Sequence, residues 1–213
     1  MKTLLLLFCI FSITRVANAQ LFRKTWETGS YTDTSGRKFS GLIFYAIPEA
    51  SVFKGKGDHL LFKADKNADQ QKIASDRIAA FTISTDSFTV SHVPALEKFP
   101  FLQIIINHQT KLYYSAIAQG SIPIVGAGLI GGAIGAAALS GKGSTAYYFG
   151  SDADHITTLR GKNFVEAMST VMSDKPEVVA KIRNKTFKPG SMKKLLAYYL
   201  TGVLPKESVD DVY

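Results

Sequence analysis

Short apolar runs recur between Trp26 and Ile117, and polar or turn-forming residues separate them. The runs are rich in β-branched and aromatic residues, which is typical of strands bounded by Gly, Asp, Asn and Ser. One hairpin is marked directly, because Asp33-Thr34-Ser35-Gly36 lies between two such runs and Gly adopts positive φ without steric cost. The predicted strands are Tyr31-Thr32, Phe39 to Tyr45, Leu60 to Lys63, Ile78 to Ser84, Ser87 to His92, Leu102 to Asn107 and Lys111 to Ile117. This half of the chain is predicted to form an antiparallel meander.

The hydrophobic period changes after Asn163. Apolar residues now recur three and four positions apart, which predicts three short helices. The residues that set this spacing are Phe164, Val165, Met168, Val171, Met172, Val178, Val179, Ile182, Met192, Leu195, Leu196, Tyr199 and Leu200. Asp174 is predicted to cap the second helix, Ser191 to cap the third and Gly202 to close it. The predicted fold class is therefore α+β.

A central segment fits neither pattern. Ser121 to Ser140 reads SIPIVGAGLIGGAIGAAALS, with five glycines and no charged residue. The predicted organisation has four parts: a signal peptide at 1-19, an antiparallel β domain at 20-119, a glycine-rich apolar segment at 120-143, and at 144-213 a strand plus a helical portion that packs on the β domain.

The first nineteen residues have the three parts of a secretory signal peptide. Lys2 supplies a positive charge, Leu4 to Ile13 are almost all apolar, and Ala17-Asn18-Ala19 offers the small residues that a signal peptidase reads. The apolar run covers about ten residues, whereas a membrane-crossing helix needs about twenty. Cleavage is therefore predicted before Gln20. The mature protein is expected to be exported, in the periplasm or in association with the outer membrane.

Composition narrows the chemistry of the mature chain. Cys9 is the only cysteine and lies in the signal peptide, which removes disulfides, thiolate nucleophiles and cysteine metal sites. The net charge of +8 falls to +6 when Lys2 and Arg15 leave with the signal. The closest basic clusters, Lys181 to Lys185 and Lys193-Lys194, lie in predicted helices, where a solvated face explains them. No nucleic-acid partner is predicted.

Three segments of the mature chain stand out: the turn and strand from Tyr31 to Ile43, Ala74-Ser-Asp-Arg-Ile-Ala-Ala-Phe81, and Asn163-Phe164 before paired helices. They resemble segments of exported proteins of unknown function from Bacteroidota bacteria. The resemblance covers most of the mature chain and brings no catalytic signature with it. It implies that the strands containing Leu112-Tyr113-Tyr114 and Tyr147-Tyr148-Phe149 are neighbours, so that the glycine-rich segment is an elaboration between them.

One motif in this segment suggests a cofactor. Gly126-Ala127-Gly128-Leu129-Ile130-Gly131 matches the G-x-G-x-x-G of dinucleotide-binding folds, and Asp152 stands where a ribose-binding carboxylate is sought. Such a fold needs alternating parallel βαβ units, however, and the chain after Asp152 has mainly helical spacing. Pro123 also removes a backbone donor from the supposed strand. A dinucleotide-binding protein or oxidoreductase that uses Gly126-Gly131 is the alternative interpretation, and no cofactor is predicted.

Other catalytic patterns fail. A phosphate-binding loop at Gly141-Lys142 would need Gly at position 136 and Ser or Thr at position 143, where the chain has Ala136 and Gly143. Asp152, Asp154 and His155 offer too few carboxylates for a calcium loop and are predicted to form a polar turn. His59, His92 and His108 stand singly, and neither a zinc motif nor a Gly-x-Ser-x-Gly is present. No catalytic, cofactor or metal residue is predicted, and a non-enzymatic role is favoured.

The glycine-rich segment then carries the functional prediction. Gly128 and Gly132, and Gly131 and Gly135, are pairs of small residues four apart, which allow close helix packing in a membrane. In water, each Gly costs a helix about 1 kcal/mol relative to Ala, which favours a loop. The chain is interpreted as a non-catalytic cell-envelope protein that binds a membrane, or another copy of itself, through 122-139. Whether this segment spans a membrane, packs on a partner or forms a loop stays open, as do the ligand and the oligomeric state.

Overall fold

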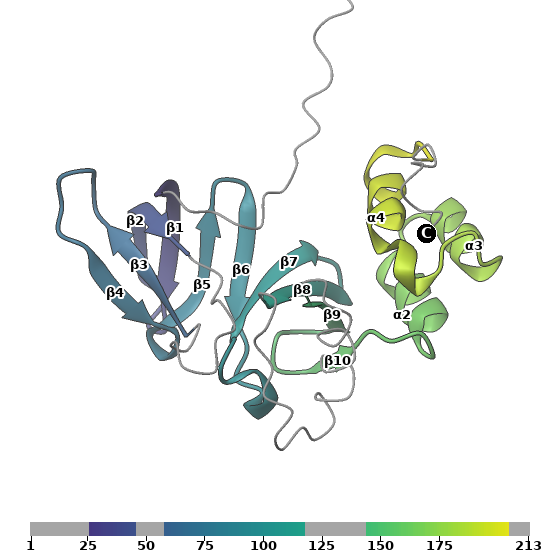
Figure 1. Ribbon diagram of the computed structural model, residues 1–213, viewed down its shortest axis with the longest axis horizontal. Helices are drawn as coiled ribbons and strands as arrows, with labels where there is room; N and C mark the ends of the chain where they lie inside the picture. Colours follow the sequence, from purple (N-terminus) through teal and green to yellow (C-terminus); the bar gives the residue numbers. More distant parts are fainter. Residues whose placement is uncertain (1–25, 46–57, 118–143, 205–213) are drawn as a thin grey trace, which may run out of the picture.

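The computed structural model describes residues 26–45, 58–117 and 144–204 of the 213-residue chain (Figure 1). The predicted signal peptide, the cleavage point at Gln20 and the packing residues Gly128, Gly131, Gly132 and Gly135 lie outside these ranges. The strands are β1 (Glu27–Asp33), β2 (Lys38–Phe44), β3 (His59–Lys63), β4 (Gln71–Ala74), β5 (Ile78–Ile83), β6 (Asp86–Val90), β7 (Phe101–Ile106), β8 (Lys111–Ile117), β9 (Ser144–Gly150) and β10 (Ile156–Thr158). The α-helices are α2 (Phe164–Val171), α3 (Pro176–Arg183) and α4 (Met192–Thr201).

All ten described strands belong to one antiparallel sheet, in the order β10-β9-β8-β7-β6-β5-β1-β2-β3-β4. The predicted antiparallel sheet followed by short helices is confirmed. The strand order departs from a simple meander at one point, because β5 returns to pair with β1. In this pairing Phe81 of β5 lies opposite Tyr31 of β1. β1 therefore lies inside the sheet, between β5 and β2, and two meanders meet there.

The helices pack beside the β7–β10 part of the sheet (Figure 1). Most of their predicted apolar positions form one core with Ile106 and Leu112 of the sheet, and Phe164, Met168 and Leu195 are almost fully buried in it. Two other predicted positions, Val165 and Leu200, are 40% and 72% exposed. The burial of these side chains is the main favourable contribution to helices as short as these. Within the described part of the chain, no helix combines the length and apolarity needed to cross a bilayer.

The opposite face of the same strands is also covered. Tyr113 follows Leu112 in β8, so its side chain points to the other face, where it packs in a second core. This core includes Leu96, from the short 3-10 turn η2 (Pro94–Leu96), and Ala153, from the β9–β10 turn. A third core covers β1 to β6, and its aromatic pairs include Phe81 stacked on Phe88 with ring centroids 4.6 Å apart.

The predicted turn and cap residues have mixed outcomes. Gly36 closes the first hairpin with φ +86°, and Gly202 ends α4 in the left-handed conformation, both as predicted. The prediction that Asp174 caps α3 is wrong, because Lys175 occupies that position and no side chain caps the helix. Asp174 instead accepts a 2.9 Å hydrogen bond from the Tyr199 hydroxyl. Ser191 is at the predicted start of α4, but its hydroxyl donates to the Lys188 carbonyl.

Candidate functional site

A cleft of about 330 Å³ lies between the β9–β10 edge of the sheet and helix α2. Seven of its ten lining residues have polar side chains, although apolar atoms make up more of the lining surface. The residues come from four places in the chain: the β7–β8 turn, β9 and its following turn, β10, and α2. The residues are Thr110, Phe149, Gly150, Ser151, His155, Thr157, Asn163, Glu166, Ala167 and Thr170. This volume is at the lower end of the range for small-molecule sites, about 300–1,000 Å³.

Helix α2 contributes one complete side to the cleft. Asn163, Glu166, Ala167 and Thr170 are spaced by three, one and three residues, so they lie along one stripe of the helix. The core residues of α2 form the neighbouring stripe and fix the rotation of the helix about its axis. Burial of the apolar stripe therefore turns the polar stripe toward the sheet edge.

Two local features hold the chain segments that border the cleft. A side chain at Gly150 would collide with the backbone carbonyl of His155, so glycine is what permits the tight β9–β10 turn. After β10, the Asn163 side-chain amide donates to the Thr158 carbonyl at 3.0 Å, and its oxygen accepts from the Arg160 amide at 2.7 Å. These contacts fix the path from the sheet edge into α2.

His155 is the only histidine in the lining of the described cleft, and Asp152 orients it. Nδ1 of His155 lies 2.8 Å and 2.9 Å from the two carboxylate oxygens of Asp152. Asp152 is an acceptor, so the proton of the neutral imidazole is on Nδ1 and Nε2 is left as an acceptor. This hydrogen bond from the His155 side chain, aided by the backbone amides of Asp154 and His155, lowers the pKa of Asp152 to about 2.

A second carboxylate of the same turn holds a second histidine. Asp154 accepts from the His92 backbone amide at 2.6 Å and lies 3.1 Å from His92 Nδ1. The predicted polar turn at Asp152, Asp154 and His155 is thus two separate Asp–His pairs. Among the described residues no group of three or more His, Cys, Asp or Glu side chains is arranged to hold a metal ion.

The two pairs predict different responses to removal of the imidazole. In His155→Ala the pKa of Asp152 should rise from about 2 toward its ordinary 3.8, because its largest stabilising contact is lost. In His92→Ala the pKa of Asp154 should stay low, because the backbone amide of residue 92 is its main donor and remains. Carboxyl titration by NMR measures both. An unchanged Asp152 pKa in His155→Ala would contradict the assigned pair.

The sign of the linked stability follows from the lowered pKa. Asp152 stabilises the folded state above its unfolded pKa near 3.8, and this contribution is lost as the pH falls toward about 2. Asp33, in the first hairpin, also has its pKa lowered to about 2, chiefly by the Ser35 side-chain hydrogen bond. It serves as an internal control, because neither histidine substitution touches it.

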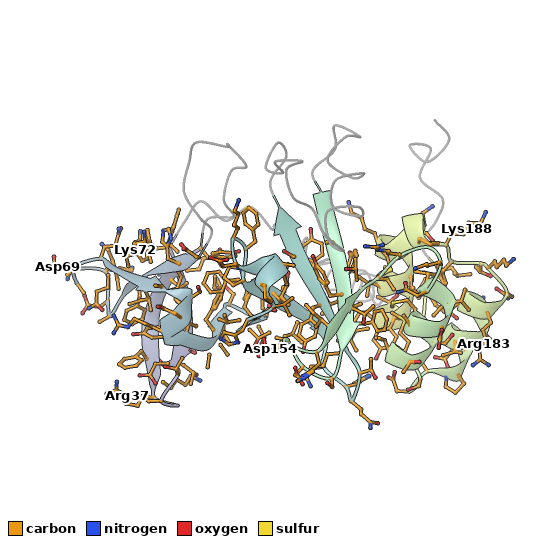
Figure 2. All side chains as sticks on the ribbon, turned by 90° about the horizontal axis from the view of Figure 1, so that it is seen from below. Arg37, Asp69, Lys72, Asp154, Arg183 and Lys188 are labelled. Atoms are coloured by element: carbon orange, nitrogen blue, oxygen red, sulfur yellow. The ribbon has the colours of Figure 1, made fainter. Side chains whose placement is uncertain are left out.

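The glycine-rich segment is attached at the other end of β9. β8 and β9 pair along their whole length, from Lys111 opposite Gly150 to Ile117 opposite Ser144. The expectation that these two strands are neighbours is therefore confirmed. In Figure 2, Asp154 of the β9–β10 turn lies on the lower side of the molecule. The opposite end of the β8–β9 ladder, where β8 ends and β9 begins, points upward.

Comparisons with known proteins identify no relative of this chain. No family model, curated protein or solved structure matches the chain. The resemblance to exported Bacteroidota proteins stays a prediction, and the proposals below depend on the geometry of this chain.

The sequence suggests a cation site or a polar turn at Asp152, Asp154 and His155 and favours the turn, but it does not single out Thr110, Thr157 or Glu166. The polar positions on this side of α2, residues 163, 166 and 170, recur at helical spacing in the sequence. What they face is not visible there, because the opposing residues come from two other turns and β10. Sequence spacing therefore indicates only the α2 side of the cleft.

Proposed function

We propose that the protein is an exported, non-catalytic component of the cell envelope that acts by binding, with residues 122–139 associating with a membrane or with the same segment of another copy. The observation that carries the proposal is the β8–β9 ladder, which brings both ends of the segment to adjacent positions, Ile117 and Ser144. The described strands form one continuous sheet from β10 to β4. An uncharged apolar run between two directly paired strands favours a role in association with a membrane or a partner.

The ladder also limits the form that membrane association can take. Neighbouring strands are about 5 Å apart, so residues 118–143 begin and end at neighbouring points, at the same end of β8 and β9. An 18-residue helix is about 27 Å long, close to the roughly 30 Å of a hydrocarbon core. After a single crossing, residues 140–143 would have to return across the membrane, yet four residues extend at most about 14 Å. The proposal is therefore an interfacial or re-entrant attachment, or a contact between copies.

The helices favour a lipid surface over a contact between copies. Between residues 164 and 204 the chain has seven Lys and Arg against three Asp and Glu. Near the end of α4, Leu200 and Val203 are 72% and 67% exposed, and Leu204 is 48% exposed. Basic side chains combined with exposed apolar ones suit the interface of an anionic membrane.

The geometry gives no support to the alternative, a dinucleotide-binding protein that uses Gly126-Gly131. That fold places its fingerprint between parallel strands, with the pyrophosphate at the start of the crossover helix. Every described strand pair is antiparallel, including the two strands that flank the motif, β8 and β9.

The experiment that tests the proposal is Gly132→Leu in the mature protein, followed by flotation with phosphatidylglycerol vesicles and by sedimentation without lipid. Leu adds apolar surface, so attachment by hydrophobic burial predicts equal or stronger flotation. Close packing between small-residue faces predicts weaker self-association, because the side chain separates the backbones.

Thr34→Leu is the control, since Thr34 is exposed in the hairpin between β1 and β2, and these strands lie on the opposite side of the molecule from the helices (Figure 1). The control should leave flotation and sedimentation unchanged. Wild-type protein that neither floats with vesicles nor self-associates would refute the proposal.

A further inference from the structure

The cleft between β9–β10 and α2 presents hydrogen-bonding groups that have no partner among the described residues. These are the hydroxyls of Thr110 and Thr157, Nε2 of His155 and the carboxylate of Glu166. The other polar side chains of the lining are engaged: Ser151 donates to Asp152, Thr170 to the Glu166 carbonyl, and Asn163 bridges two backbone groups. The free groups come from four different elements and border the same space.

The free groups are mainly hydrogen-bond acceptors. In the neutral imidazole of His155, the hydrogen bond to Asp152 places the proton on Nδ1 and leaves Nε2 as an acceptor, and the Glu166 carboxylate is also an acceptor. The two threonine hydroxyls both donate and accept. A matching ligand must therefore bring several donors to the acceptors and some acceptors to the threonines, which is the hydrogen-bonding character of a polyol.

Charge excludes other ligand classes. The cleft lining contains no Lys or Arg, and Lys111, beside it, is engaged with the Ser151 carbonyl at 2.7 Å. An anion would meet the Glu166 carboxylate without a compensating cation. A metal ion would find a single carboxylate, and no metal-binding group of three is present in the described part of the molecule. A neutral ligand fits this arrangement best.

Phe149 adds an apolar surface to the polar lining. It lies beside Thr157 on the paired strands β9 and β10, and its ring is half-buried against the helical core. The C–H face of a sugar ring can pack on such a surface while its hydroxyls bond to the side chains around it. From these observations we propose that the cleft binds one or two units of a neutral saccharide.

The proposed site is separate from the glycine-rich segment. It is at the Gly150 end of β9 and the segment is at the Ser144 end, about 20 Å away at 3.3 Å per residue. Saccharide binding and membrane association can therefore succeed or fail independently. A variant that lacks residues 118–143 should still bind the saccharide.

The test is a titration of ¹⁵N-labelled mature protein with N-acetylglucosamine and with maltose, followed by NMR. A small, open site of this kind should bind with a Kd of about 1 mM. Amide shifts should concentrate in residues 149–157 and 163–170. His155→Ala and Glu166→Gln should each weaken binding about tenfold, a loss of one hydrogen bond to a charged or oriented group.

Two matched controls come from the same molecule. His92 is the other exposed histidine held by a carboxylate of the β9–β10 turn, and Glu177 is in the first turn of α3 as Glu166 is in that of α2. His92→Ala and Glu177→Gln should leave the affinity unchanged.

Three results would overturn the proposal. One is the absence of localised shifts from either sugar at about 50 mM, far above the expected Kd. The second is binding that His155→Ala and Glu166→Gln leave intact. The third is tighter binding of inorganic phosphate than of either sugar at the same amides.

Discussion

Replacing residues 118–143 with Asn-Gly should give a folded protein that no longer partitions to membranes. Ile117 and Ser144 are opposite each other at the end of the β8–β9 ladder, and Asn-Gly is the preferred two-residue connection between antiparallel strands. Circular dichroism and thermal unfolding would test the fold, and vesicle flotation would test partitioning.

A length-matched variant separates apolarity from chain length. Replacing residues 118–143 with a Gly/Ser sequence of the same length keeps the long connection and removes its apolar residues. It should also lose flotation. Unchanged flotation of the folded Asn-Gly variant would show that residues 118–143 are a permissive surface insertion, and that any membrane contact comes from elsewhere.

Phe164→Ala should lower the free energy of unfolding by about 3–5 kcal/mol, the usual cost of removing a buried aromatic ring. Phe164 is 1% exposed and lies in the core that the helices share with Ile106 and Leu112. Val165, next to it, is 40% exposed, so Val165→Ala should change stability by less than about 1 kcal/mol. Chemical denaturation of the three proteins measures the difference.

The same experiment tests whether helices and sheet unfold together. Trp26 is the only tryptophan and packs against Phe44 of β2, with ring centroids 5.9 Å apart. In Figure 1, β1 and β2 are on the opposite side of the molecule from the helices. Because one sheet connects the two regions, tryptophan fluorescence and helical circular dichroism should shift together in Phe164→Ala. A shift in circular dichroism alone would show that the helices unfold as a separate unit.

The sequence predicted those parts of the fold that local pattern specifies. The first hairpin, strands β5 to β8 and most of the buried positions of the helices follow from residue spacing and turn residues. β4 and β10 are not predicted, since Gln71–Ala74 is a four-residue edge strand with only two apolar residues and Ile156–Thr158 has only three residues. The pairing of β1 with β5 depends on contacts between distant residues, which no local pattern reports.

The same limit explains the cap and site predictions. Asp174 has the spacing of a helix cap, but its carboxylate is taken by Tyr199, 25 residues later. His92 gave no signal in the sequence because its partner, Asp154, is 62 residues away. The cleft is built from local segments whose meeting depends on the pairing of β9 with β8 and β10. The sequence therefore predicts that these lining residues are polar and exposed, but it does not predict that they lie around one cleft.

The proposed function requires the mature protein to be exported and held at a membrane of the envelope. Fractionation of cells that produce the native chain, with a high-salt wash of the membranes and intact-mass measurement, tests both requirements. We expect a protein that begins at Gln20 and stays with the membranes after the wash, because apolar burial is insensitive to salt. A mature protein found entirely in the soluble fraction, or a chain that retains residues 1–19, would contradict it.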